Sequence, residues 1–211
     1  MRSTTVSIQT LRRLPLYLHY LKSVKDELPS ISATLLADAL GLNDVQVRKD
    51  LGSVSGNGRP KKGYVTEELI VDLEEYLGCN SNTPAVLIGA GNLGRALLSY
   101  SGFSDYGLRI VAAFDASPAV VGKEAGDMTV KSIDELKQVC TDNDVKLGII
   151  TVPASGAQDA CDKLVACGIT AIWNFAPTTL KVPCGVLVEN ENLASSLAVL
   201  SKHLISDGRI A

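Results

Sequence analysis

The sequence predicts an α/β protein, in which a parallel sheet flanked by helices follows a small helical domain at the N-terminus. From residue 85 onward, short apolar runs typical of buried strands alternate with segments of helical spacing, a pattern typical of parallel sheets with right-handed crossovers. Before residue 80, apolar residues recur at helical spacing in four segments. The chain has 211 residues, 46% of them hydrophobic, which suffices for one or two domains with cores of their own.

The first helix is expected over Thr10–Leu28, where leucines recur at helical spacing, with Pro15 near its first turn or at a kink. A fourth helix is expected after Thr66, which would cap it, and the apolar residues of this helix share one face. The stretch Cys79–Thr83 that follows is polar. We therefore expect a domain boundary there.

A helix-turn-helix pattern lies between these two helices. Ser32 is a good N-cap for a short helix, Ala33–Leu40, and Gly41 can adopt the left-handed conformation that ends it. A third helix is expected over about Asp44–Ser53, with Val45, Val47 and Leu51 as its apolar positions. The residues that this helix would turn outward are Gln46, Arg48 and Lys49. Two helices joined in this way are a common DNA-binding element.

The stretch Gly56–Tyr64 cannot be a helix, because it holds three glycines and a proline around three cations. This composition fits a two-stranded wing whose tip lies along a phosphate backbone. Residues 1–65 carry ten Lys and Arg against five Asp and Glu, whereas the remainder carries ten against eighteen. A basic head on an acidic body suggests that only the head meets a polyanion. The alternative is a solvated face without a partner, and the charge alone does not decide between them.

A glycine-rich turn follows the first strand of the predicted sheet. Residues 85–94 read AVLIGAGNLG, and Asp115 follows about 20 positions later, at the end of a second apolar run. This is the arrangement of a dinucleotide-binding βαβ unit, the core of a Rossmann-type domain. A pyrophosphate would lie against the backbone of the turn and of the helix start, which comprise Gly89, Ala90, Gly91, Asn92, Leu93 and Gly94.

The glycines and the acid of this motif have separate tasks. Gly89 permits the tight turn, Gly91 lets the backbone approach a pyrophosphate, and Gly94 lets the helix pack close to the sheet. Asp115 would accept hydrogen bonds from ribose hydroxyls and repel a 2′-phosphate, which favours NAD(H) over NADP(H). The alternative is a glycine-rich turn retained for packing alone.

Further strands and helices are expected to alternate to the end of the chain. Strands are predicted at 85–90, 108–114, 146–152, 170–174 and 185–189, and helices at 92–101, 132–141, 154–166 and 191–205. Strand ends, where this fold binds ligands, carry Thr151–Pro153 and Asn174–Pro177. The last helix carries a stripe of leucines, Leu193, Leu197, Leu200 and Leu204. It packs either on its own sheet or on a second subunit.

Groups that would support catalysis are missing from the sequence. The two histidines, His19 and His203, lie on predicted helices outside the nucleotide crevice, and no tyrosine begins a Tyr-x-x-x-Lys pair. Tyr100 could be an acid but has no obvious partner. The five cysteines form no Cys-x-x-Cys pair and, with two histidines, no metal-ligand cluster. We interpret them as reduced, mostly buried thiols, with a redox-active disulfide as the alternative. The sequence therefore predicts nucleotide binding without reaction.

These features together resemble the Rex family of redox-sensing transcriptional repressors, over about residues 10–205. The segments that carry the resemblance are Arg13–Tyr17, Val47–Leu51, Gly58–Tyr64, Val86–Gly94, Thr151–Pro153 and Asn174–Pro177. It implies a homodimer with a winged-helix DNA-binding domain (1–80), a Rossmann NAD(H)-binding domain (84–189) and a domain-swapped C-terminal dimerisation helix (190–211). It also implies a sensor of the NADH/NAD⁺ ratio that binds a pseudo-palindromic operator in double-stranded DNA and releases it when NADH binds.

The resemblance also implies roles for particular residues. It places Gln46, Arg48 and Lys49 on the recognition helix, and Arg59, Lys61 and Lys62 on the wing, near phosphates or a minor groove. It assigns the pyrophosphate to Gly89, Gly91 and Gly94, and the adenosine ribose to Asp115. Thr151, Val152 and Pro153 would border the nicotinamide end. Tyr100 matches a family tyrosine near the nicotinamide that takes part in switching.

The chain departs from the family pattern in two places. Many members continue with Ser-Tyr-Phe-Gly where this chain reads Gly52–Gly56, so the preferred operator is expected to differ in its base steps. The family often has an Arg where His19 stands and an Asp where Asn192 stands, paired across the dimer. Here that ion pair would be replaced by groups that can hydrogen-bond but attract each other only weakly.

Two other functions compete with the repressor. One is an NAD-dependent oxidoreductase with a basic accessory domain, and the other is a CoA-binding protein, against which Asp115 weighs. No segment is long and apolar enough to span a bilayer, and the N-terminus has no apolar run that resembles a signal peptide. We therefore expect a cytoplasmic protein without a membrane partner.

Overall fold

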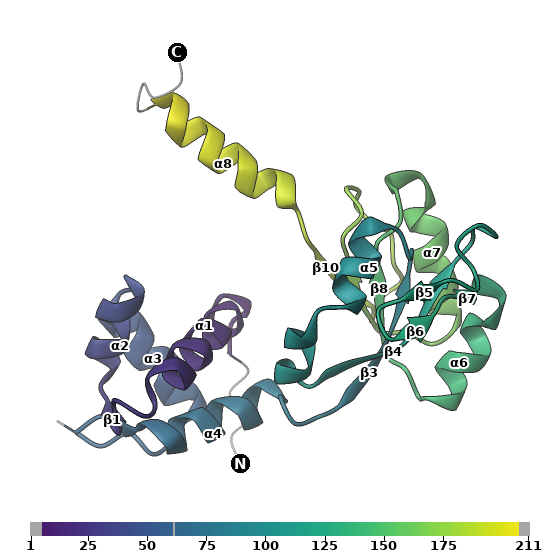
Figure 1. The fold of residues 1–211 in the computed structure, drawn as a ribbon. Helices are drawn as coiled ribbons and strands as arrows, with labels where there is room; N and C mark the ends of the chain where they lie inside the picture. The colour runs from purple at the N-terminus through teal and green to yellow at the C-terminus, as the bar shows by residue number, and fades with distance from the viewer. Residues whose placement is uncertain (1–5, 61, 207–211) are drawn as a thin grey trace. The chain divides into compact units, whose positions relative to one another are not determined.

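The computed structural model describes residues 6–60 and 62–206 and divides the chain into two compact units (Figure 1). The first unit comprises Met1–Ser81 and Ser104–Gly107, and the second comprises Asn82–Phe103 and Leu108–Ala211. Each unit has a hydrophobic core built from its own residues. The parallel sheet and the preceding helical domain predicted from the sequence are both present.

Over the described residues 6–60 and 62–81, the first unit forms four α-helices and one short antiparallel ribbon. The helices are α1 (Ile8–Val24), α2 (Ala33–Leu40), α3 (Asp44–Val54) and α4 (Thr66–Leu77), and the ribbon pairs β1 (Ser30–Ile31) with β2 (Tyr64–Val65). The side chains that fill the core are apolar and fully buried, among them Leu14, Leu18, Leu21, Leu36, Val47, Leu51, Leu69 and Leu73. They come from all four helices, so each helix depends on the others for burial of its apolar face.

The ends of α1 and the cap of α4 differ from the prediction. Ser7 caps α1 by accepting a hydrogen bond from the Thr10 N–H, so the helix begins earlier than expected and Pro15 lies inside it. Thr66 does not cap α4, because its hydroxyl donates to the Leu28 carbonyl oxygen instead. The buried Thr66 thus fixes the start of α4 to the chain that follows α1. The Thr66 hydroxyl group therefore forms a tertiary hydrogen bond in place of the predicted helix cap.

The helix-turn-helix pattern is confirmed, with one side chain misplaced by the prediction. Ser32 caps α2 through the Leu35 N–H, Gly41 ends it at a φ of 64°, and the Asn43 side chain caps α3. Val45, one of the three predicted apolar positions, lies in the first turn of α3 and is 63% exposed. Only Val47 and Leu51 of the three predicted positions are buried.

The predicted two-stranded wing is smaller than expected. Its two arms meet in a single antiparallel bridge, Arg59 with Gly63, and the strand β2 that follows pairs with β1 rather than with a second wing strand. Gly63 has a φ of 75°, and a Cβ there would lie 2.2 Å from the Ile31 carbonyl oxygen. Glycine is therefore required where the wing joins the ribbon.

The second unit is built on a six-stranded parallel sheet with the strand order β10-β9-β8-β3-β4-β7. Its strands are β3 (Thr83–Ile88), β4 (Leu108–Asp115), β7 (Lys131–Ser132), β8 (Leu147–Ile150), β9 (Ala171–Asn174) and β10 (Leu187–Asn190). The order reverses direction between β3 and β8, as it does in dinucleotide-binding folds. Alternate residues of β3 are buried on opposite faces, Val86 and Ile88 on one and Ala85 and Leu87 on the other. Helices cover both faces, so the strands read as continuous apolar runs.

The helices that precede α8 in this unit are α5 (Asn92–Leu98), α6 (Leu136–Asp142) and α7 (Ala154–Ala166), with a short 3-10 helix at Ile133–Glu135. Another short 3-10 helix, Ser101–Tyr106, is divided between the two units after Phe103. The segment between β4 and α6 contains three strands that the sequence did not predict: β7 and the hairpin of β5 (Glu124–Ala125) and β6 (Met128–Thr129). Each is two residues long, which is too short to show the alternation of polar and apolar residues.

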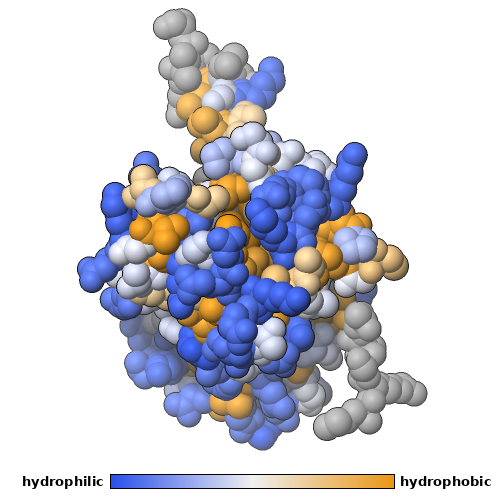
Figure 2. Space-filling view, turned by 90° about the vertical axis from the view of Figure 1, so that its right-hand side faces the viewer, coloured by the Kyte–Doolittle hydropathy of each residue, from blue (hydrophilic) through white to orange (hydrophobic). Residues whose placement is uncertain are grey.

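In the last helix, α8 (Leu193–Ser206), the leucine side chains that the structure describes are exposed. Leu197 and Leu200 are 63% and 61% exposed, and Leu204 is 41% exposed. Figure 1 shows α8 near the C-terminal end of the chain, and Figure 2 shows apolar side chains of this segment in orange at the top. The stripe therefore does not pack on the chain's own sheet. The Leu193 side chain lies outside the part that the structure describes.

Candidate functional site

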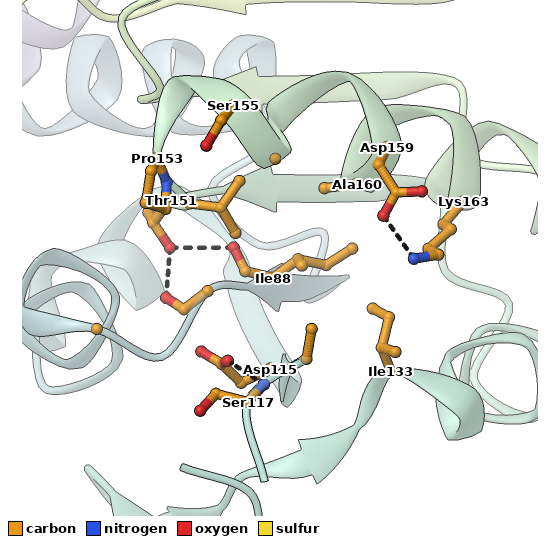
Figure 3. A pocket seen from close by; sticks show the side chains of 15 residues that line it. Ile88, Asp115, Ser117, Ile133, Thr151, Pro153, Ser155, Asp159, Ala160 and Lys163 are labelled. Atoms are coloured by element: carbon orange, nitrogen blue, oxygen red, sulfur yellow. Dashed lines mark hydrogen bonds and ion pairs between the residues drawn. The ribbon is translucent and has the colours of Figure 1, made fainter. Parts of the chain in front are cut away.

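A cavity of about 360 Å³ lies in the second unit, beyond the carboxyl ends of β3, β4 and β8 (Figure 3). It is lined by Ile88, Gly89, Gly91, Asp115, Ala116, Ser117, Ile133, Thr151, Val152, Pro153, Ser155, Gly156, Asp159, Ala160 and Lys163. Figure 3 shows Asp115 and Ser117 on one side of the cavity and the α7 side chains on the other. The cavity thus lies at the point where the strand order reverses, the ligand position of open α/β sheets.

Two glycines of the turn are required by the backbone around them. Gly89 has a φ of 107°, and a Cβ there would lie 2.8 Å from the Cγ1 of Val152. A Cβ at Gly94 would lie 2.0 Å from the Gly89 carbonyl oxygen. That same oxygen accepts a hydrogen bond of 2.7 Å from the Thr151 hydroxyl. Both glycines therefore let the start of α5 and the loop after β8 close onto the turn.

Gly91 differs from these two glycines, because the protein itself does not require it. A Cβ at this position would meet no atom within 4 Å, and Gly91 lines the cavity. The missing side chain therefore leaves open space at the cavity wall, where a ligand could come close to the protein main chain. A glycine retained for packing alone would not leave this gap.

The carboxylate of Asp115 is held at the end of β4 by two backbone hydrogen bonds. Its Oδ2 accepts from the Ala90 N–H at 2.9 Å, and its Oδ1 accepts from the Ser117 N–H at 2.8 Å. Each carboxylate oxygen has a second lone pair, so both can still accept from a hydroxyl group in the cavity. The Ala90 N–H, by contrast, is already satisfied by Asp115 and is not available to a ligand.

The remaining predicted residues divide between the cavity and the surface. Val152 and Pro153 line the cavity together with Thr151. Asn92 and Leu93 are exposed at the start of α5. Tyr100 is 59% exposed, is not among the cavity residues, and packs edge-on against Phe103 with the ring centroids 5.0 Å apart. The structure therefore does not bring Tyr100 to the cavity.

Part of the cavity wall was not predicted from the sequence. It comprises Ile88, Ala116, Ser117 and Ile133 together with five α7 residues, Ser155, Gly156, Asp159, Ala160 and Lys163. The Asp159 carboxylate pairs with the Lys163 ammonium group at the rim. The α7 residues recur at helical spacing directly after Thr151–Pro153, and this spacing is the signal that could have identified them.

The first unit exposes its predicted polar residues on α3 and the wing. Gln46, Arg48 and Lys49 are exposed, as are Arg59 and Lys62. The Arg48 guanidinium group pairs with the Asp44 carboxylate at 3.1 Å, which is an exposed i,i+4 ion pair of small energy. Arg48 and Arg59 line one hollow, together with the start of α2. Lys61 lies outside the described residues.

A buried carboxylate, that of Asp50 on α3, joins α3 to α1. Asp50 is 1% exposed and receives two hydrogen bonds from the Arg13 guanidinium group, from Nε to Oδ2 at 2.7 Å and from Nη2 to Oδ1 at 3.0 Å. The Tyr17 hydroxyl donates to Oδ2 at 2.8 Å. Gln46 Nε2 and Thr10 Oγ1 donate to Oδ1 at 2.9 and 3.1 Å. This network was not predicted from the sequence.

The protonation states of this network follow from burial and hydrogen bonding. Burial alone would raise the pKa of the Asp50 carboxyl group, but the hydrogen bonds from Arg13, Tyr17 and Gln46 and the charge of Arg13 hold that pKa below its ordinary value. Burial, and then the hydrogen bond to Asp50, raise the pKa of Tyr17 to about 12. Asp50 is therefore an ionised acceptor at neutral pH, and Tyr17 a protonated donor.

The cysteines form no disulfide in the described part of the chain. Cys79, Cys140 and Cys161 are buried, Cys167 is half-buried and Cys184 is exposed. Burial, and then the neighbouring Cys167, raise the pKa of the Cys140 thiol to about 11.

Within residues 6–60 and 62–206, no group of three or more His, Cys, Asp and Glu side chains could hold a metal ion. No helix found there is long and apolar enough to cross a bilayer.

Two family models match this chain. The model described as "CoA binding domain" matches residues 80–178, and "Putative DNA-binding protein N-terminus" matches residues 5–52. Among proteins of assigned function, the redox-sensing transcriptional repressor Rex of Streptomyces avermitilis is 41% identical over 203 residues, which are 96% of this chain and 81% of that protein.

Solved structures of RSP, a Rex-family repressor, have the same fold. The crystal structure of RSP in complex with β-NAD⁺ and operator DNA matches with a TM-score of 0.90 and 36% identity, over 98% of this chain and 95% of RSP. The complex of RSP with β-NADH matches with a TM-score of 0.87, over 98% of this chain and 97% of RSP. These matches extend over both units of the chain.

Proposed function

Because the chain belongs to the Rex family of redox-sensing transcriptional repressors, we propose that it represses transcription in response to the NADH/NAD⁺ ratio. It binds operator DNA as a dimer and releases the DNA when NADH binds. It is a regulator rather than an enzyme. The observation that carries this proposal is the cavity at the strand-order reversal, with Asp115 fixed beside the open space at Gly91, in a chain that also contains a helix-turn-helix.

In this proposal, one dinucleotide binds in the cavity in a defined direction. Asp115 accepts from the hydroxyls of the adenosine ribose, and the pyrophosphate lies against the main chain at Gly91. Thr151, Val152 and Pro153 border the nicotinamide end. When bound, the cofactor supplies a ring that differs in charge and planarity between NAD⁺ and NADH. The contacts that distinguish the two forms must therefore lie at this end.

DNA is bound by the first unit. Helix α3 enters the major groove, where Gln46, Arg48 and Lys49 face base edges and phosphates. The wing lies along the backbone through Arg59, Lys61 and Lys62. The hollow shared by Arg48 and Arg59 supports a joint contact of α3 and the wing with one stretch of phosphates. A repressor that binds chromosomal DNA in this way acts in the cytoplasm of a bacterium.

The dimer is formed through α8. Its leucines Leu197, Leu200 and Leu204 are exposed in the single chain, and a partner subunit that covers them would remove apolar surface from water. A swapped helix places each α8 on the other subunit. Two-fold symmetry then matches the two half-sites of a pseudo-palindromic operator.

CoA is the second candidate ligand, since the family model that matches residues 80–178 is named for CoA. CoA carries a phosphate on its adenosine ribose, and the Asp115 carboxylate would repel it in the same way as the 2′-phosphate of NADPH. We therefore expect a smaller shift of the melting temperature with CoA than with NADH.

The test is a fluorescence-anisotropy titration of the full chain on labelled operator DNA, with no ligand, with NAD⁺ and with NADH. The operator is first selected by the protein from randomised duplexes. We expect the protein to bind the operator tightly without ligand and with NAD⁺, and to release the operator when NADH is added. Equal DNA affinity with NAD⁺ and NADH would overturn the redox-sensing function, and a larger response to CoA would favour the second candidate.

A further inference from the structure

We propose that Asp50 is a positioning residue that orients the Gln46 carboxamide for DNA, so that Gln46 selects adenine over guanine at the base it faces. The inference rests on the proposed function, because it takes α3 to be the helix that enters the major groove. Gln46 is the residue in contact with the base, and Asp50 acts only through it.

The orientation of the Gln46 carboxamide follows from the chemistry of its partner. An ionised carboxylate has no hydrogen to donate, so a carboxamide beside it must turn its nitrogen toward it. Gln46 Nε2 lies 2.9 Å from Asp50 Oδ1, one helical turn further along α3. The carbonyl oxygen Oε1 is therefore directed away from Asp50, and none of the described residues donates a hydrogen bond to it.

Asp50 can orient Gln46 because its own position is fixed from α1. Arg13 binds both of its oxygens, and Thr10 and Tyr17 each donate to one of them. The carboxylate is 1% exposed, so water does not compete for these hydrogen bonds. Gln46 itself is exposed. Its carboxamide is thus oriented by a buried group before any ligand arrives.

The bond to Asp50 decides which base the free part of the carboxamide can match. One of the two N–H groups of Gln46 is used by Asp50, which leaves one N–H donor and the Oε1 acceptor. In the major groove, adenine presents one acceptor, N7, and one donor, the N6 amino group. Guanine presents two acceptors, N7 and O6, which require two donors. The oriented Gln46 can therefore make two hydrogen bonds to adenine but only one to guanine.

A purely structural role for Gln46 is the competing explanation. Gln46 would then only complete the hydrogen bonds of the buried carboxylate, and its replacement would lower the stability of the first unit without any change of base preference. The two explanations therefore differ in a measurable way, because only the positioning role alters the ratio of affinities for operators that differ at one base.

The experiment measures this ratio with the full-length dimer. Operator duplexes with adenine or guanine at each half-site position compete with the labelled selected operator in an anisotropy assay. We expect one position at which the wild type prefers adenine about tenfold. The Gln46→Ala variant should lose this preference, and Asp50→Ala should reduce it to about twofold, because Gln46 can then offer both N–H groups to guanine.

Tyr17→Phe is the matched control, since it removes a hydrogen bond to the other Asp50 oxygen, Oδ2, and leaves the bond to Gln46 in place. It should lower the melting temperature but keep the adenine preference. A preference lost in Tyr17→Phe as well, or kept in Gln46→Ala, would overturn the positioning role.

A second measurement covers the case in which Asp50→Ala does not fold. The wild type is titrated with operators that contain 7-deazaadenine, which lacks N7, or purine, which lacks the amino group, at the selected position. Each analogue should weaken binding several-fold if Gln46 contacts both groups. Unchanged affinity with both analogues would overturn the inference while the repressor function stands. A wild type that selects no operator at all would instead overturn the proposed function, and this inference with it.

Discussion

The hydroxyl group of Thr151, in the loop after β8, donates a 2.7 Å hydrogen bond to the carbonyl oxygen of Gly89, in the turn after β3. The same hydroxyl lies 3.2 Å from the Ile88 carbonyl oxygen. The Thr151 side chain therefore connects the loop after β8 to the glycine-rich turn after β3, at the point where the strand order reverses. Together with the hydrogen bond from the Thr151 N–H to the Ile88 carbonyl oxygen, this bond joins two segments 62 residues apart in the sequence, both of which line the cavity.

Replacement of this hydroxyl should affect both stability and cofactor binding. In Thr151→Val the side chain keeps nearly the same volume, but the Gly89 carbonyl oxygen loses its partner. We expect the free energy of unfolding to fall by about 1–2 kcal/mol. We also expect NADH to bind several-fold more weakly, because the turn is no longer held in position. Urea unfolding and calorimetry measure the two effects. Unchanged NADH affinity in a destabilised variant would limit the role of Thr151 to stability.

Asp115 should determine the choice of cofactor. We expect the wild type to bind NADH more tightly than NADPH, because the carboxylate would face the 2′-phosphate across a few ångströms. Asp115→Ala should weaken NADH binding and narrow the difference between the two cofactors. The control is Asp127→Ala, an exposed carboxylate outside the cavity of the same unit. Equal affinities for NADH and NADPH in the wild type, measured by calorimetry, would contradict this role.

The two DNA-binding elements should respond differently to loss of charge. Lys49→Ala should lower operator affinity by about 1–3 kcal/mol if a base contact is lost, and should relax the preference at that base. Lys62→Ala on the wing should weaken binding to all duplexes evenly and flatten the salt dependence by about one unit. Lys137→Ala, on α6 of the other unit, is the control. If the wing variant lost sequence preference and kept its salt slope, the two roles would be reversed.

Acid should destabilise the first unit through Asp50. The pKa of its carboxyl group is lower in the folded protein than its ordinary value of 3.8. Its contribution to stability is therefore complete above pH 3.8 and is lost as the pH falls below this value through the pKa of the folded state. Asp50→Asn should be less stable than the wild type at neutral pH, and the gap should narrow as the pH falls below 4. Urea unfolding at several pH values checks this, and a constant gap would contradict it.

The sequence predicted those parts of the fold whose signal is local. The strands β3 and β4 are buried on both faces and read as apolar runs, and the predicted cap of α2 depends on Ser32, which lies within one helical turn of the N–H that it accepts. The two-residue strands β5, β6 and β7 carry no such pattern. The misassigned Thr66 forms its hydrogen bond with a residue 38 positions away, which no local propensity can reveal.

In the candidate site, too, the local motif was predictable from the sequence, whereas the contacts that depend on tertiary packing were not. Gly89, Gly94 and Asp115 belong to a motif with fixed spacing, and the structure gives each a steric or hydrogen-bonding reason. The α7 wall required knowledge of which helix face meets the cavity. The Asp50 network joins Arg13 and Tyr17 on α1 to Gln46 on α3. Each helix contributes residues four apart, but only the packing of the two helices brings them together.

The switch should depend on α8. NADH lowers the affinity for DNA by the same factor by which DNA lowers the affinity for NADH. Each tenfold change in affinity corresponds to a coupling free energy of about 1.4 kcal/mol. If α8 joins the two subunits, it is the element through which a change at the nicotinamide end can alter the separation of the two DNA-binding units. A chain that ends after Asn192 should therefore lose NADH-dependent release of DNA, and dimerisation with it.

The truncation point follows from the structure. Glu191 must be retained, because its carboxylate accepts a 3.0 Å hydrogen bond from Trp173 Nε1 and its N–H donates to the Asn174 carbonyl oxygen. The Leu197→Lys and Leu200→Lys double variant tests the same surface without truncation, since both side chains are more than half exposed in the single chain. Sedimentation equilibrium gives the oligomeric state, and anisotropy with and without NADH gives the coupling. A truncated chain that stays dimeric and still leaves the operator when NADH is added would show that the coupling runs through other contacts.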